Sequence, residues 1–103
     1  MKRYKFQALV TPYPDQDARE QLSSGSHRMV LRAESADTHR SQVFSALVDG
    51  DGGEPFRPGR PQLTVTLRVI GDDVPDYLVI GSHFSLWSGG DVGQGIVTRR
   101  LFV

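Results

Sequence analysis

The histidines and serines are the residues of this 103-residue chain whose types could support catalysis or metal binding. Imidazole can act as a base or bind a metal, but the three histidines are too far apart to form a metal-ligand motif. No serine stands in the Gly-x-Ser-x-Gly turn that exposes a catalytic nucleophile. The residues considered are His27, His39, His83, Ser24, Ser26, Ser82 and Ser85.

The cysteine count and the acidic clusters narrow the chemistry further. The chain has no Cys, which excludes disulfides, thiolate catalysis and zinc–thiolate sites. Residues 49–54, Asp-Gly-Asp-Gly-Gly-Glu, lack the ligand spacing, the distal Glu and the flanking helices of a calcium loop. Asp72, Asp73 and Asp76 could pair for acid–base catalysis, but a solvated turn explains them more simply. We therefore expect no catalytic residue, no metal and no cofactor. A small hydrolase stays a third hypothesis, for which the sequence supplies no positioned nucleophile and base.

Charge gives a weak signal for nucleic acid. Twelve basic residues balance twelve acidic ones, so the chain lacks the long-range field that draws proteins onto polyanions. Ten of the twelve cations are Arg. This bias reflects either coding preference in a GC-rich genome or selection of the planar guanidinium for phosphate. The candidate RNA-binding positions are Arg28, Arg32, Arg57 and Arg60.

Trp87 is the strongest candidate for a binding residue. If Phe84 and Leu86 face the core, alternation along a strand places Trp87 outside with His83 and Ser85. An exposed Trp is typical of interface hot spots. In the alternative, the strand bends at Gly89 and the Trp side chain folds over the end of the fold, because Trp is usually well buried.

Alternation of apolar and polar residues predicts the elements that position these side chains. Residues 40–48 suit a helix or a strand, and we choose a strand because the neighbouring elements are strands. An apolar run at 77–80 follows the break at 71–73, and a short helix over 17–22 is possible. Six or seven short strands with turn signals every 8–12 residues indicate a sandwich or a closed barrel. The strands are predicted at residues 4–11, 27–34, 40–48, 62–69, 83–87 and 96–102.

Glycines near the end of the chain have structural explanations. Gly89 and Gly90 can adopt positive φ and reverse the chain. Gly93 and Gly95 at the start of a strand indicate a bulge or a close approach of backbones. A phosphate cradle is disfavoured, because no helix pattern and no Lys-Ser or Lys-Thr follows.

Three segments together resemble a known domain. Lys-Phe-Gln-Ala-Leu-Val at 5–10 matches an opening strand Lys-Phe-Glu-Ala-Glu-Val, and Phe-Arg-Pro-Gly at 56–59 with Thr-Val-Thr-Leu at 64–67 matches a Met-Pro-Gly turn and a Val-Thr-Leu strand. His-Phe-Ser-Leu-Trp-Ser-Gly-Gly-Asp-Val-Gly-Gln-Gly-Ile-Val at 83–97 matches a closing glycine hairpin. In this order, they resemble the third, C-terminal β-barrel domain of elongation factor Tu and related translational GTPases. The resemblance implies an all-β, six-stranded antiparallel closed β-barrel over residues 1–103, a free-standing domain without GTP binding.

The departures from that family bear on function. His83 and Trp87 stand where the family carries Arg on the strand that packs toward its GTPase domain, and Asp91 stands where it has another Arg. The loop that helps hold aminoacyl-tRNA in the family is acidic here, at residues 15–20. Inherited tRNA carriage is therefore not expected.

Two hypotheses follow for the function. The first is a non-catalytic binding module that docks a protein partner, or a second copy of itself, through His83, Ser85, Trp87 and Asp91. The alternative is an RNA-binding, translation-related protein that uses the four arginines. The N-terminus lacks an apolar stretch of signal-peptide length, and no window approaches a membrane span, so we expect a cytoplasmic protein that does not bind membranes.

Overall fold

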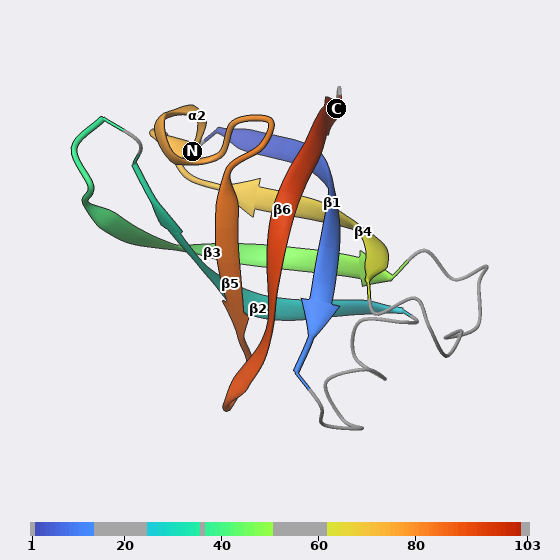
Figure 1. Ribbon diagram of the computed structural model, residues 1–103. Coiled ribbons are helices and arrows are strands. Elements are labelled where there is room, and N and C mark those ends of the chain that lie inside the picture. Colours follow the sequence, from blue (N-terminus) through green and yellow to red (C-terminus); the bar gives the residue numbers. More distant parts are fainter. Residues whose placement is uncertain (1, 14–24, 36, 51–61, 102–103) are drawn as a thin grey trace.

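Six antiparallel strands close into a barrel in the computed structural model, which describes residues 2–13, 25–35, 37–50 and 62–101 (Figure 1). Around the barrel the strands follow the order β1-β4-β3-β2-β5-β6, and β6 returns to pair with β1. This arrangement confirms the predicted all-β, six-stranded closed barrel. The strands are β1 (Arg3–Pro12), β2 (Ser26–Glu34), β3 (Ser41–Gly50), β4 (Leu63–Ile70), β5 (His83–Trp87) and β6 (Asp91–Leu101).

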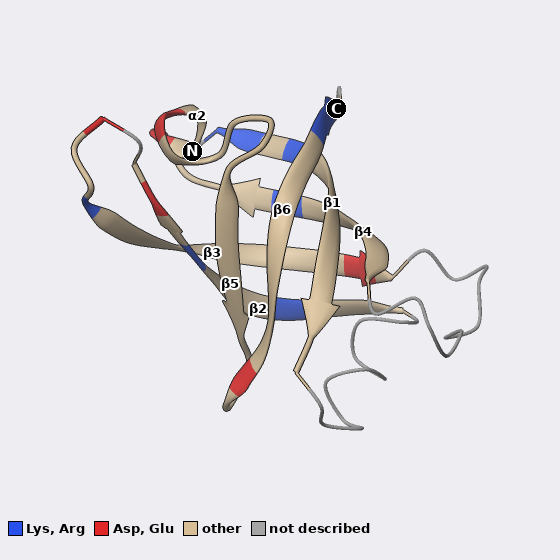
Figure 2. Cartoon of the chain, viewed as in Figure 1, with Lys and Arg blue, Asp and Glu red and all other residues tan. Residues whose placement is uncertain are grey.

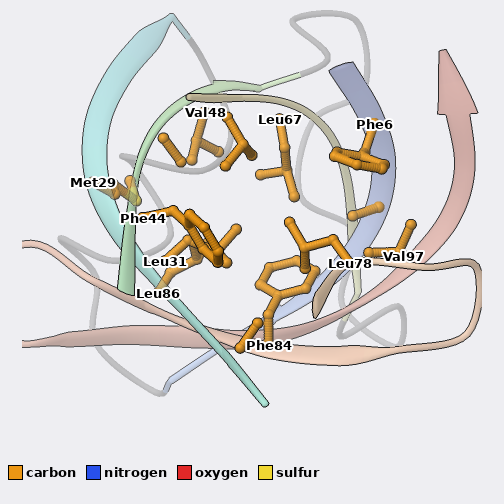
Figure 3. Close-up of a cluster of buried hydrophobic side chains, with 14 of the residues drawn as sticks. Phe6, Met29, Leu31, Phe44, Val48, Leu67, Leu78, Phe84, Leu86 and Val97 are labelled. Atoms are coloured by element: carbon orange, nitrogen blue, oxygen red, sulfur yellow. The ribbon is translucent and has the colours of Figure 1, made fainter. Parts of the chain in front are cut away.

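The core fills the inside of the barrel with alternate side chains of β1 to β5, and β6 adds Val92 and Val97 (Figure 3). This period follows from the pleat, which points successive side chains to opposite faces of the sheet. Phe84 and Leu86 face the core as the sequence suggested, and Tyr4 and Leu63 are partly buried at its margins. The strand residues among these buried core positions are Phe6, Ala8, Val10, Met29, Leu31, Ala33, Phe44, Ala46, Val48, Val65, Leu67, Val69, Phe84, Leu86, Val92 and Val97.

The ambiguous segment at 40–48 is a strand, β3, as predicted. It pairs with β2 on one side and β4 on the other, so its backbone groups are satisfied by neighbours rather than within a helix. Phe44, Ala46 and Val48 are buried, whereas Val43 and Ser45 are exposed. The apolar residues thus follow the period of a strand.

The connection between β4 and β5 differs from the prediction. The sequence suggested only an apolar run at 77–80, but the chain forms a short helix, α2 (Val74–Tyr77). Pro in its first turn favours helix initiation, and Val74 and Leu78, four residues apart, are both buried. Val79 and Ile80 are 53% and 69% exposed. The run therefore splits, with Leu78 in the core and the next two side chains outside.

The glycine hairpin joins β5 to β6 closely. Gly89 has φ +72° and reverses the chain, while φ of Gly90 lies outside the left-handed region. The predicted close approach at Gly93 and Gly95 is confirmed within β6: an added Cβ would lie 2.7 Å from the Thr11 carbonyl oxygen and 2.4 Å from Phe84 Cζ, respectively. The β5–β6 register also shifts between Leu86 and Trp87.

Several predictions lie outside the described residues: the helix over 17–22, the acidic loop at 15–20, the Pro-Gly turn at 58–59, and the arginines Arg57 and Arg60. In the part of the chain that the structure describes, no helix has the length and apolarity needed to cross a membrane.

Candidate docking surface

Trp87 lies on the outer wall of the barrel at the end of β5. Phe84 and Leu86 are buried, so alternation places His83, Ser85 and Trp87 outside. The Trp87 side chain is 51% exposed. The outward position predicted from the sequence is confirmed, and the alternative in which the ring folds over the barrel end is wrong.

Strand register places further apolar side chains beside Trp87. Val30 on β2 is the direct partner of Trp87 on β5 and of Ser45 on β3. Ser45 in turn is the partner of Ile70 on β4. Outward side chains at paired positions of neighbouring strands lie roughly 5 Å apart. We call this set, Trp87, Val30, Ser45 and Ile70, the apolar row.

The apolar row borders a shallow, open groove of about 370 Å³. Val30 and Ile70 are 37% and 40% exposed, and Val43, one row further along β3, is 59% exposed. Soluble proteins expose single apolar residues routinely, but contiguous apolar surface marks interaction sites. The groove is lined by Arg28, Met29, Val30, Val43, Phe44, Ser45, Trp87, Ser88 and Gly89.

The other predicted protein-binding residues share this wall without lining the groove. Ser85 pairs with Arg32 on one side and with Gln94 on the other. Asp91 is the direct partner of Trp87 across the β5–β6 hairpin, and His83 pairs with Ile96 at the opposite end of β5. The structure therefore places Trp87 at the groove, with Ser85 and Asp91 beside it and His83 at a distance.

Cations form a second row next to the apolar row. Lys5 on β1 pairs with Arg68 on β4, Arg68 pairs with Leu47 on β3, and Leu47 pairs with Arg28 on β2. In Figure 2, blue marks Lys and Arg positions on β1, β4 and β2, the three strands that contribute cations to this row. Of the predicted RNA-binding residues, Arg28 lines the groove, and Arg32 lies four residues further along β2 on the same outer face.

Most described carboxylates lie away from these two rows, but Asp91 at the β5–β6 turn is the direct partner of Trp87 in the apolar row. Figure 2 shows acidic positions at α2, at the β2–β3 hairpin and at the β5–β6 turn. Asp49 is next to the cation row, where it accepts a hydrogen bond from Ser26 Oγ and lies 3.7 Å from Arg68 Nε. The Arg68 side chain is 57% exposed, so this pair contributes at most about 1 kcal/mol and leaves the row available to a ligand.

Two other residues whose types could support catalysis, Ser82 and His39, make local contacts in turns instead. Ser82 Oγ donates to the Val79 carbonyl at 2.7 Å and accepts the Val79 N–H at 3.0 Å, which fixes the turn before β5. His39 contacts Glu34 at 3.2 Å on the exposed β2–β3 hairpin. Within the described ranges, no three His, Asp or Glu side chains gather closely enough to hold a metal ion.

Sequence reasoning missed four members of the surface: Val30, Val43, Ser45 and Ile70. Val30 carried a usable signal, because it is an apolar residue on the face of β2 that otherwise bears Arg28 and Arg32. The others could be found only from the register that joins β2, β3 and β4.

No protein-family model, curated protein or solved structure matches the chain. The resemblance to the third domain of elongation factor Tu therefore stays a prediction that rests on the three sequence segments.

Proposed function

We propose that this protein is a non-catalytic binding module that docks a protein partner through the apolar row. The observation that carries the proposal is the half-exposed Trp87 ring beside the exposed Val30 at the edge of an open groove. Trp is the residue type most enriched in hot spots, and it acts by filling a desolvated site on the partner.

The burial of Trp87 by a partner would be energetically significant. Complete burial of an aromatic side chain removes roughly 150–250 Å² from water. Trp87 is 51% exposed, so a partner would cover roughly 100 Å² of this ring. At about 25 cal/mol per Å², this burial contributes about 2.5 kcal/mol, which is enough to make the residue a hot spot.

The resemblance to the third domain of elongation factor Tu supports docking through the same face of the barrel. If this barrel is related to that domain, β5 corresponds to the strand that meets the GTPase domain in longer relatives. His83 and Trp87 then replace arginines on a surface already suited to docking. Under this proposal, the barrel acts in the cytoplasm without GTP binding or catalysis of its own.

The test is affinity capture from an extract of the source organism, with quantification of each captured protein. We expect Trp87→Ala and Val30→Asp to lose a partner that the wild-type chain retains. Ile80→Ala is the matched control, because Ile80 is 69% exposed and belongs to the α2–β5 connection rather than to the apolar row. If Trp87→Ala leaves every captured protein unchanged, the proposal is wrong.

RNA binding is the second candidate, and the presence of Arg28 and Trp87 in the same groove favours it. An aromatic ring can stack on a base while a guanidinium contacts phosphate. Such binding would weaken steeply with salt, because bound phosphates release counterions. Undetectable binding of oligouridylate at low salt would remove this candidate.

A further inference from the structure

We infer that the docking segment of the partner is an extended, acidic one, in which acidic and apolar residues alternate. This inference rests on the proposed function and specifies the partner of the same surface. The argument starts from the charges beside the apolar row. The cations on this part of the wall are Arg3, Lys5, Arg28, Arg32 and Arg68.

The spacing of the two rows fits an extended segment that crosses the strands. The cation row runs over four neighbouring strands, from Lys5 to Arg28, a span of about 14 Å at 4.8 Å per strand. Alternate residues of an extended chain lie roughly 6.7 Å apart. Acidic residues at positions i and i+4 of the segment would therefore reach both ends of the cation row.

The apolar row supplies the second half of the pattern. It is separated from the cation row by two residues on each shared strand: Val30 follows Arg28 on β2 and Ile70 follows Arg68 on β4, whereas Ser45 precedes Leu47 on the antiparallel β3. Side chains of an extended segment point alternately to its two sides. A segment that lies between the rows would direct its acidic residues to the cations and its apolar residues to Trp87, Val30 and Ile70.

The same charges disfavour a second copy as the occupant. A two-fold interface brings the same patch of both copies together, so the cations of one copy would face those of the other. Like charges opposed across an interface cost free energy.

The side chains of the apolar row favour a protein segment over RNA. Single-stranded RNA binds on aromatic platforms that stack successive bases. Trp87 is the aromatic member of this row, and the other apolar members, Val30 and Ile70, are aliphatic.

The experiment measures fluorescence anisotropy of labelled synthetic probes with the whole chain. One peptide alternates Glu and Leu, a second replaces each Glu with Lys, and a third has the first composition with its Glu residues in one block. Oligouridylate is the nucleic-acid probe. We expect the alternating acidic peptide to bind most tightly and its affinity to fall as salt rises.

The variants locate the contact. Arg28→Ala together with Arg68→Ala should weaken the alternating acidic peptide roughly tenfold, which corresponds to about 1.4 kcal/mol for two charge pairs. Trp87→Ala should weaken binding of this peptide by a similar factor. Lys5→Ala tests whether the peptide reaches the β1 end of the cation row. Arg40→Ala is the control, because Arg40 is an exposed cation before β3 at the hairpin end. Thermal unfolding checks that each variant is folded.

The outcomes separate this inference from the proposed function. Equal or tighter binding of the Lys peptide or of the block peptide overturns the inference, as does an unchanged affinity in the Arg28 and Arg68 double variant. If no peptide binds while captured proteins still depend on Trp87, the acidic segment is wrong and the docking function stands. Trp87-dependent binding of oligouridylate alone overturns the inference in favour of RNA. If neither probes nor captured proteins depend on Trp87, both proposals fall.

Discussion

Gly95→Ala tests how closely β6 must approach Phe84 on β5. A Cβ at this position would lie 2.4 Å from Phe84 Cζ, 2.8 Å from Phe84 Cε2 and 3.0 Å from the Leu9 carbonyl oxygen. Optimal contacts between carbon atoms are about 3.5–4.0 Å, so the Phe84 ring must move by more than roughly 1 Å. Phe84 is 4% exposed and belongs to the core, which leaves little space for that movement.

We therefore expect Gly95→Ala to destabilise the barrel by about 3 kcal/mol, the upper end of the range for overpacked cores. For a domain of this size, the loss corresponds to a fall in Tm of roughly 12–24 °C. Chemical and thermal unfolding followed by circular dichroism measure both quantities.

Gly90→Ala is the matched control, because an added Cβ there meets nothing within 4 Å and the residue does not have positive φ. It should change stability by no more than about 0.5 kcal/mol. Phe84→Leu should cost less in the Gly95→Ala background than in the wild type, because it removes the ring atoms that clash, and a double-mutant cycle measures this coupling. The reasoning is refuted if Gly95→Ala unfolds at the same denaturant concentration as Gly90→Ala.

Two further predictions concern neighbouring positions. Leu86→Ala should lower the free energy of unfolding by about 2–5 kcal/mol, because Leu86 is 1% exposed in the core. Trp87→Ala should lower it clearly less, because half of the surface of Trp87 already meets solvent. Equal losses in denaturant unfolding would contradict the outward position of Trp87. Gly89→Ala should lower the free energy of unfolding by about 1–2 kcal/mol, because Gly89 has a φ of +72°. Gly89→Asn should lower it less, because Asn tolerates the left-handed region better. The same unfolding assay measures both variants, and an Ala variant as stable as the wild type would contradict the predicted strain in this turn.

Period-two alternation explains why most of the barrel could be predicted. In β2 and β4 the inward residues are apolar and most outward ones polar, so local sequence identifies both the strand and its buried face. The α2 helix was missed because its signal is short and nonlocal: Val74 and Leu78 are buried only because the end of the barrel lies beneath them. Propensity over four residues does not reveal that burial.

The surface was only partly predictable for a similar reason. Alternation alone placed Trp87 outside, since Phe84 and Leu86 are strongly apolar. The apolar and cation rows depend on register between strands far apart in sequence, such as Arg68 on β4 and Lys5 on β1. A slip of one residue would send these side chains to the other face, and no local pattern in either strand fixes that register.

The most direct test of the docking proposal observes Trp87 itself. It is the one tryptophan of the chain, so fluorotryptophan labelling gives a single ¹⁹F resonance that reports on this side chain alone. When a captured partner is added, we predict that the resonance shifts and loses its sensitivity to solvent isotope, because the partner covers the ring. A partner that binds while the resonance and its solvent sensitivity stay unchanged would contradict the claim that the protein docks through Trp87.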